Sequence, residues 1–113
     1  MEQALNRIIQ ESVPGKQVTI AHVIASPAPE LYERLGMDPA GAIGILTITP
    51  CEAAIIAADA AAKTAMVELA FLDRFTGSVV LSGDIQSVKT ALRSVCELLR
   101  EKLGFTVVDV TIS

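Results

Sequence analysis

The side chains most able to do chemistry are few and widely separated. The chain has one histidine, His22, and two cysteines, Cys51 and Cys96. A general base needs a nucleophile or an orienting group within hydrogen-bond reach. For His22 the candidate partners are Cys51 and Asp73, and either would act only if the fold brings it close to the imidazole. The sequence contains no glycine-rich nucleotide signature, no HExxH pattern and no Cys/His spacing for zinc. We therefore predict no cofactor, no metal and no catalytic residues, and His22 is more typical of a packed or interface residue.

A second candidate is a connection between two predicted strands that carries two charges and an aromatic ring. It consists of Asp73, Arg74, Phe75, Thr76, Gly77 and Ser78. A simple hairpin requires only turn residues such as Gly77, whereas loops held by rigid strands often carry function. A capped surface hairpin accounts for the same residues without any function, so both interpretations stay open from the residues alone.

A third candidate is a polar stripe on an alanine-rich segment. Glu52, Asp59 and Lys63 follow spacings of seven and four residues, and nearly all their neighbours are Ala or Ile. Residues at these spacings share one face of a helix, where an Asp–Lys pair is worth only about 0.3–0.5 kcal/mol. The stripe is explained either by a thin helix packed within its own domain or by a contact with a neighbouring subunit.

The elements that must position these residues are separated by Gly and Pro. From residue 42 onward, the apolar patterns predict a strand over 42–48, a helix to about Ala65, strands over 67–72 and 78–82, a long helix and a final strand over 105–112. Thr49, Pro50 and Glu52 form a capping-box pattern for the first helix. Gly83-Asp84 and Gly104 are expected to bound the second helix. This order predicts an α+β fold with a ferredoxin-like β-α-β-β-α-β core at about 42–112, an antiparallel sheet and helices on one face.

Two additions precede that core. Residues 17–25 alternate in the manner of a strand. A short helix is expected over 30–35, with Pro29 as an early position and Gly36 at its end. Val13-Pro14-Gly15-Lys16 is a turn that separates a short leader from the rest, so the predicted organisation is a leader at 1–13 and one domain at 14–113. The leader fits either a strand or a helix fragment.

Composition excludes several classes of function. A net charge of −4 and a pI near 4.8 disfavour nucleic-acid and anionic-membrane partners. The longest stretches without charge, 17–29 and 39–51, contain Pro and are too short to span a bilayer. No secretory signal opens the chain, and two isolated cysteines are typical of reduced thiols in a cytoplasm. Hydrophobic residues make up 51% of 113, so we expect part of this apolar surface to be buried against other chains.

Three segments, in one order, resemble a known family. Residues 14–25, 42–50 (Ala-Ile-Gly-Ile-Leu-Thr-Ile-Thr-Pro) and 71–77 (Phe-Leu-Asp-Arg-Phe-Thr-Gly) are similar to circularly permuted bacterial microcompartment (BMC) shell proteins. These are the hexamer-forming subunits of ethanolamine-, propanediol- and choline-utilisation compartments. The resemblance runs over about residues 7 to 111. It implies a permuted BMC domain that forms structural tiles of a selective barrier, with itself, other shell proteins and encapsulated enzymes as partners.

The resemblance also implies roles for particular residues. Residues 73–78 are expected near the central axis of the hexamer, and Asp59, Lys63 and Ser26 at its edge. The leader corresponds to a strand that joins copies of itself in a small β-barrel over the axis, and the residues concerned are Arg7, Ile8, Ile9, Gln10 and Glu11. Three residues depart from the family pattern. Ser26 stands where unpermuted tiles usually carry Arg, and Cys51 stands where relatives more often have Ser. Ile112 stands where a basic residue is common. A thiol near a helix N-terminus, as expected for Cys51, can have a lowered pKa.

Two alternatives of other classes remain. An oligomeric domain of ferredoxin-like fold could bind a small metabolite between subunits and serve regulation, with His22 and acidic loop residues as contacts. An enzyme subunit would have to use Asp73, Arg74 and His22. Both compete with the structural tile as explanations of the same residues.

Overall fold

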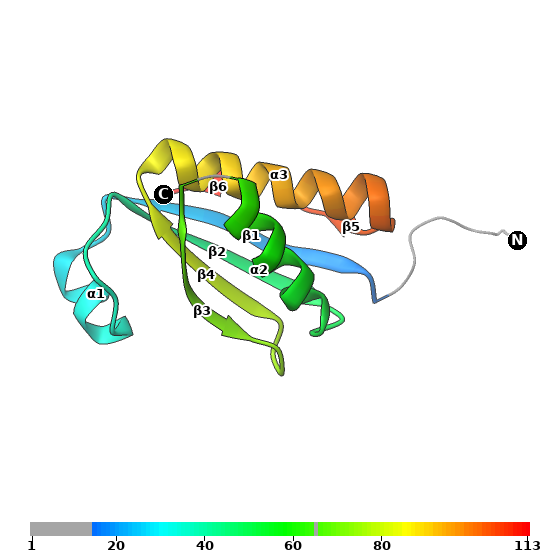
Figure 1. The fold of residues 1–113 in the computed structure, drawn as a ribbon, viewed down its shortest axis with the longest axis horizontal. Helices are drawn as coiled ribbons and strands as arrows, with labels where there is room; N and C mark the ends of the chain where they lie inside the picture. The colour runs from blue at the N-terminus through cyan, green and yellow to red at the C-terminus, as the bar shows by residue number, and fades with distance from the viewer. Residues whose placement is uncertain (1–14, 65) are drawn as a thin grey trace, which may run out of the picture.

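The computed structural model describes residues 15–64 and 66–113, and Figure 1 shows their arrangement. The elements follow in the order β1 (Gln17–Ala25), α1 (Pro29–Leu35), β2 (Ala42–Thr49), α2 (Ala53–Thr64), β3 (Glu68–Asp73), β4 (Ser78–Gly83), α3 (Ile85–Leu103), β5 (Thr106–Val107) and β6 (Thr111–Ile112). The predicted leader strand at 1–13 lies outside the described residues. The predicted α+β order from residue 42 is confirmed.

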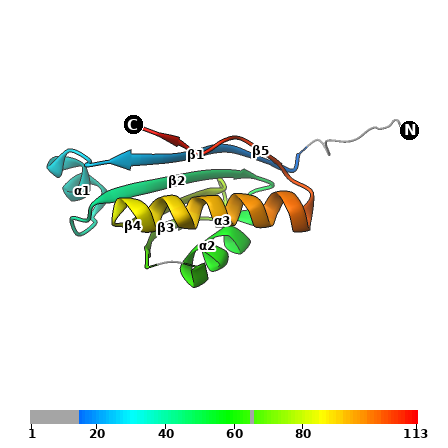
Figure 2. The same ribbon diagram turned by 90° about the horizontal axis from the view of Figure 1, so that it is seen from above.

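One sheet face is covered by α2 and α3, which lie side by side beneath the strands in Figure 2. Gly44 of β2 explains the close approach of α3. A Cβ added there would lie 2.7 Å from Cγ1 of Val88 and 3.5 Å from Leu92, so a larger residue would push the helix away. Leu46, Val88 and Leu92 are fully buried in this layer. The hydrophobic core of the single chain therefore lies between the sheet and these two helices.

Both ends of α3 are formed as the sequence predicts. Asp84 is the N-cap, and its carboxylate accepts a hydrogen bond from the backbone N–H of Ser87 at 2.9 Å. This bond and the one from the Ser87 hydroxyl hold the pKa of Asp84 below its ordinary value. Gly104 ends the helix in the left-handed conformation, where glycine is favoured.

The start of α2 differs from the prediction. The helix begins at Ala53 rather than directly after Thr49. The N–H groups of Ala53 and Ala54 donate to the carbonyls of Pro50 and Cys51, three residues back in each case. Residues 50–52 are therefore a tight turn, and the capping box expected from Thr49 and Glu52 does not start the helix.

The order of strands in the sheet is β3-β4-β2-β1-β5, with β6 also paired to β1. The strand β1 was expected as an addition to the core, but it is inserted between β2 and the C-terminal strands. Its ladders with β5 and β6 are parallel, so the sheet is mixed rather than wholly antiparallel. The expected single strand over 105–112 is instead two short strands, because only residues 106–107 and 111–112 pair with β1. The exposed Asp109 lies in the break between them.

Candidate functional site

The connection between β3 and β4 is a compact turn organised by Asp73. Its carboxylate oxygen Oδ1 accepts the backbone N–H groups of Phe75 at 2.9 Å and Thr76 at 3.3 Å. The bond from Phe75 is the main reason that the pKa of Asp73 lies below its ordinary value. The carboxylate is thus directed into its own loop, as in an Asx-turn.

Gly77 fixes this loop against the end of β2. Its φ of +81° is in the left-handed region, and its carbonyl accepts the N–H of Ile48 at 2.8 Å. A Cβ at this position would overlap the carbonyl oxygen of Ile48. The loop is therefore attached to the sheet rather than free to swing.

Arg74 and Phe75 project from this fixed loop. The guanidinium carbon of Arg74 lies 4.9 Å from the centre of the Phe75 ring, within the range of a cation–π contact. Phe75 is 79% exposed, which is unusual for an aromatic side chain in a folded domain. Within the predicted segment 73–78, the structure therefore presents Arg74 and Phe75 as an exposed cationic and aromatic pair, whereas Gly77 is buried.

The predicted edge residues lie elsewhere. Lys63 Nζ and Asp59 Oδ2 form an ion pair at 2.9 Å, with both side chains mostly exposed, so the pair contributes little to stability. Ser26 follows the end of β1 with a φ of +51°, and its N–H donates to the carbonyl of Gly41 at 3.1 Å. Among residues 15–64 and 66–113, the Asp59–Lys63 ion pair is the interaction recorded for these two side chains, and the contact recorded for Ser26 is made by its backbone N–H.

The two sets of residues occupy opposite ends of the sheet. Ser78 pairs with Thr47, and Gln17 pairs with Thr49, so the turn at 73–78 and the start of β1 share one end. At the other end, Ala25 and Gly83 both pair with Ala42, and Ser26 follows directly. The helix α2 starts at the first end and runs to Thr64, about 18 Å further along its axis. Lys63 therefore lies toward the Ser26 end.

The second face of the sheet is only partly covered. Side chains alternate across a strand, so Ile43 and Ile45 point away from the helices that pack on Gly44. The cross-strand partners of Ile43 are Ile24 and Ser82, and those of Ile45 are His22 and Val80. All four lie on the same face. A groove of about 550 Å³ lies on this face beside the short helix α1. It is lined mainly by apolar side chains that include Ile24, Leu31, Leu35, Ile45, Phe71 and Val80.

The edge strand β3 extends this apolar surface. Successive side chains of a strand point to opposite faces, yet apolar side chains on both faces of β3 are exposed. The exposed fractions are 42% for Leu69, 52% for Phe71 and 37% for Leu72. An exposed apolar edge strand is an open site for association. Sequence reasoning predicted surplus apolar area but did not locate it, because the single chain gives no signal of which sheet face lacks helices.

His22 and the two cysteines do not form a catalytic group. The ring nitrogens Nδ1 and Nε2 of His22 lie 2.6 Å from the Thr111 hydroxyl and 2.8 Å from the Ser113 hydroxyl, so the imidazole holds the C-terminal strand to β1.

Cys51 precedes α2, and desolvation together with the adjacent Glu52 raises the pKa of its thiol. The lowering expected from a helix N-terminus is therefore wrong. Among residues 15–64 and 66–113, no three His, Cys, Asp or Glu side chains are grouped to hold a metal ion.

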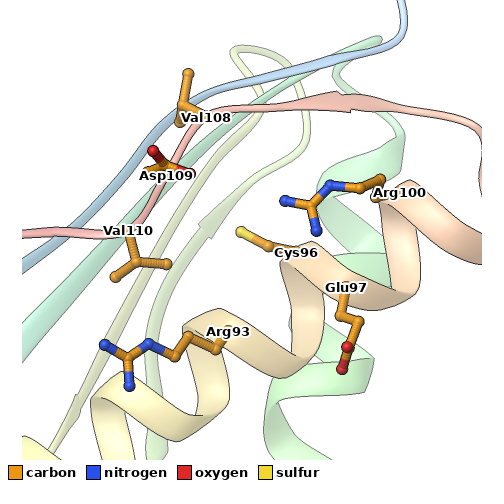
Figure 3. A pocket seen from close by; sticks show the side chains of 7 residues that line it. All are labelled: Arg93, Cys96, Glu97, Arg100, Val108, Asp109 and Val110. Carbon is orange, nitrogen blue, oxygen red and sulfur yellow. The ribbon is translucent and has the colours of Figure 1, made fainter.

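Sequence reasoning missed a pocket of about 530 Å³ beside α3. Arg93, Cys96 and Arg100 line one wall, and the segment between β5 and β6 lines the other (Figure 3). The spacing of three and four residues between these side chains places them on one helix face and was visible in the sequence.

Comparison with known proteins places the chain in a family. The model of the BMC domain matches residues 42–112, which is more than half of the chain. The chain is 58% identical over 107 residues to the bacterial microcompartment shell protein CutR of Streptococcus intermedius, covering 95% of this chain and 92% of the relative. It is 56% identical to the shell protein PduU of Salmonella typhimurium, covering 94% and 92%.

Among solved structures, a flat hexamer of CutR matches with a TM-score of 0.86 at 56% identity, covering 97% of this chain and 94% of that chain. Within the part that the structure describes, no helix is long and apolar enough to cross a membrane. Fold, motifs and similarity therefore agree: the chain belongs to the BMC domain family and is a bacterial microcompartment shell protein of the type represented by CutR and PduU.

Proposed function

We propose that six copies of this chain close into a ring and that such rings pack edge to edge into a selectively permeable layer around enclosed enzymes. The observation that carries this proposal is the open sheet face. A chain of this size leaves a continuous apolar groove and an apolar edge strand exposed. The flat hexamer of a relative 56% identical in sequence supports six as the number of copies.

The contact between subunits is proposed to lie on this open face. An apolar groove and an apolar edge strand at different places on one chain favour a head-to-tail contact, in which each copy uses one surface on each side. Such a contact closes into a ring when the rotation per copy divides a full turn. A second copy is therefore the occupant proposed for the groove beside α1.

The loop at 73–78 is proposed to face the ring axis. The start of β1 lies at the same end of the sheet as this loop, so the leader would emerge near the axis. That placement suits a barrel of leader strands, with Arg7–Glu11 as the paired segment and residues 14–113 as the ring-forming domain. A closed barrel has no free edges, which explains why a strand without a partner in its own domain would be tolerated.

Asp59, Lys63 and Ser26 are proposed to lie at the outer edge of the ring. Lys63 lies at the end of the molecule opposite to the proposed axial loop, and its long side chain is exposed. A lysine in this position could donate to backbone carbonyls of a neighbouring ring. The short Ser26 side chain would weaken the same contact relative to an arginine. Other shell proteins are the further partners proposed for this edge, and enclosed enzymes for the inner surface.

Electron microscopy of the purified full chain tests this proposal. The expected result is ring-shaped particles with sixfold symmetry that associate into flat or curved sheets at high protein concentration. Particles without rings, or a molecule that stays monomeric under all these conditions, would overturn it. A thermal shift of several degrees with one metabolite, without rings, would favour the regulatory domain instead.

A further inference from the structure

The pocket beside α3 has a distribution of charge that suits one class of ligand. Two arginines, Arg93 and Arg100, lie seven residues apart on the same helix face, about 10 Å along its axis. The thiol of Cys96 lies between them on the pocket floor, as Figure 3 shows. Val108 and Val110 line the opposite wall. The pocket thus has a cation toward each end and an apolar middle.

The acidic residues near the pocket do not neutralise both arginines. Within residues 15–64 and 66–113, neither guanidinium forms an ion pair. Glu97 lines the pocket but points away from it, while Asp109 lies across from the helix (Figure 3). The charges that face the interior are therefore two cations and one anion, which leaves an excess of positive charge in a protein whose net charge is −4.

The floor of the pocket carries no charge at neutral pH. Burial raises the pKa of the Cys96 thiol, and the nearby positive charge of Arg100 offsets this only in part. Cys96 is 4% exposed and behaves as a small hydrophobic residue in such a position. An alkyl chain could lie against this sulfur and the two valines, with its ends toward the guanidiniums.

We propose that this pocket binds a short aliphatic dicarboxylate, with one carboxylate at Arg93, the other at Arg100 and the methylene chain over Cys96. Guanidinium–carboxylate pairs are charge-assisted and often bidentate, which explains why arginine rather than lysine suits these positions. The proposal does not rest on the ring, because all residues concerned lie on one chain.

Isothermal titration calorimetry of the full chain with succinate, glutarate and adipate tests this site. Butyrate at matched ionic strength is the control ligand, since it offers one carboxylate on a similar alkyl chain. We expect saturable binding of at least one dicarboxylate and about tenfold weaker binding of butyrate, because one charge-assisted contact is lost. Equal affinity for butyrate and all dicarboxylates, or no saturable binding, would overturn the proposal.

Variants assign the binding to these residues. Arg93→Gln and Arg100→Gln should each weaken dicarboxylate binding by about tenfold. Asp109→Asn should strengthen it, because a like charge leaves the pocket. Lys102→Gln is the matched control, since Lys102 is an exposed cation on the same helix outside this pocket. Unchanged binding in both arginine variants would contradict the site, whatever the number of chains in the assembly.

Discussion

The two faces of the same sheet differ in what covers their apolar side chains. On the helix-covered face, Val79, Leu81 and Leu92 are fully buried within a single chain. On the open face, Ile24, Ile45 and Val80 are only half-buried, and the groove beside α1 remains unfilled. The first face therefore contains the folding core, whereas the second is the surface that a neighbouring copy is proposed to cover. Mutations on the two faces should separate folding from assembly.

The largest effect is expected on the covered face. Leu92→Ala removes a fully buried side chain that packs near Gly44, and we expect the free energy of unfolding to fall by about 2–5 kcal/mol. Denaturant unfolding at one fixed protein concentration measures this. A loss below about 1 kcal/mol would mean that this face is not the core of the chain.

A charge on the open face should act on assembly instead. Ile45→Asp places a carboxylate where the neighbouring copy is proposed to pack, so the ring should dissociate while the circular dichroism spectrum keeps its helix and strand content. Sedimentation velocity measures the dissociation. Ile85→Asp is the matched control, because Ile85 is an exposed isoleucine at the start of α3. Intact rings in Ile45→Asp would exclude this face as the contact between subunits.

Removal of the leader tests the end of the sheet that is proposed to face the axis. Deletion of residues 1–12 should leave both faces, and therefore the fold and the ring, unchanged. Averaged images of the rings should lose density over the axis relative to the full chain. Complete unfolding of the shortened chain would show that the leader belongs to the core of the domain.

The smallest effect on stability is expected at the proposed outer edge. Lys63→Ala removes an exposed ion pair with Asp59 and should change the free energy of unfolding by less than about 0.5 kcal/mol. Single rings should persist, whereas extended sheets in electron micrographs should become rare. Sheets as abundant as those of the unchanged chain would mean that Lys63 is not at the contact between rings.

Local signals predicted the elements of the covered face well. Asp84 and Gly104 bound α3 as expected, since capping depends on residues next to the helix end. The insertion of β1 between β2 and the C-terminal strands could not be predicted, because pairing of distant strands leaves no local mark on the sequence. The interruption of the last strand at Asp109 and the delayed start of α2 are likewise set by hydrogen bonds that residue types alone do not specify.

The candidate site likewise has features that local sequence predicts and features that depend on the fold. The turn at 73–78 and the Asp59–Lys63 pair are local features: Asp73 holds the turn through a hydrogen bond, and the pair lies four residues apart on one helix face. Their location at opposite ends of the sheet could be found only from the strand register, which the sequence does not specify. The open face could be identified only once the position of every helix was known. Composition therefore predicted surplus apolar surface without locating it.

Size-exclusion chromatography with light scattering on the full chain, at micromolar concentration in dilute buffer, tests the assembly claim most directly. We expect a single species of six chains of 11.9 kDa, about 71 kDa in total, because the apolar face needs a neighbour. A stable, cooperatively folded species of 11.9 kDa would contradict it.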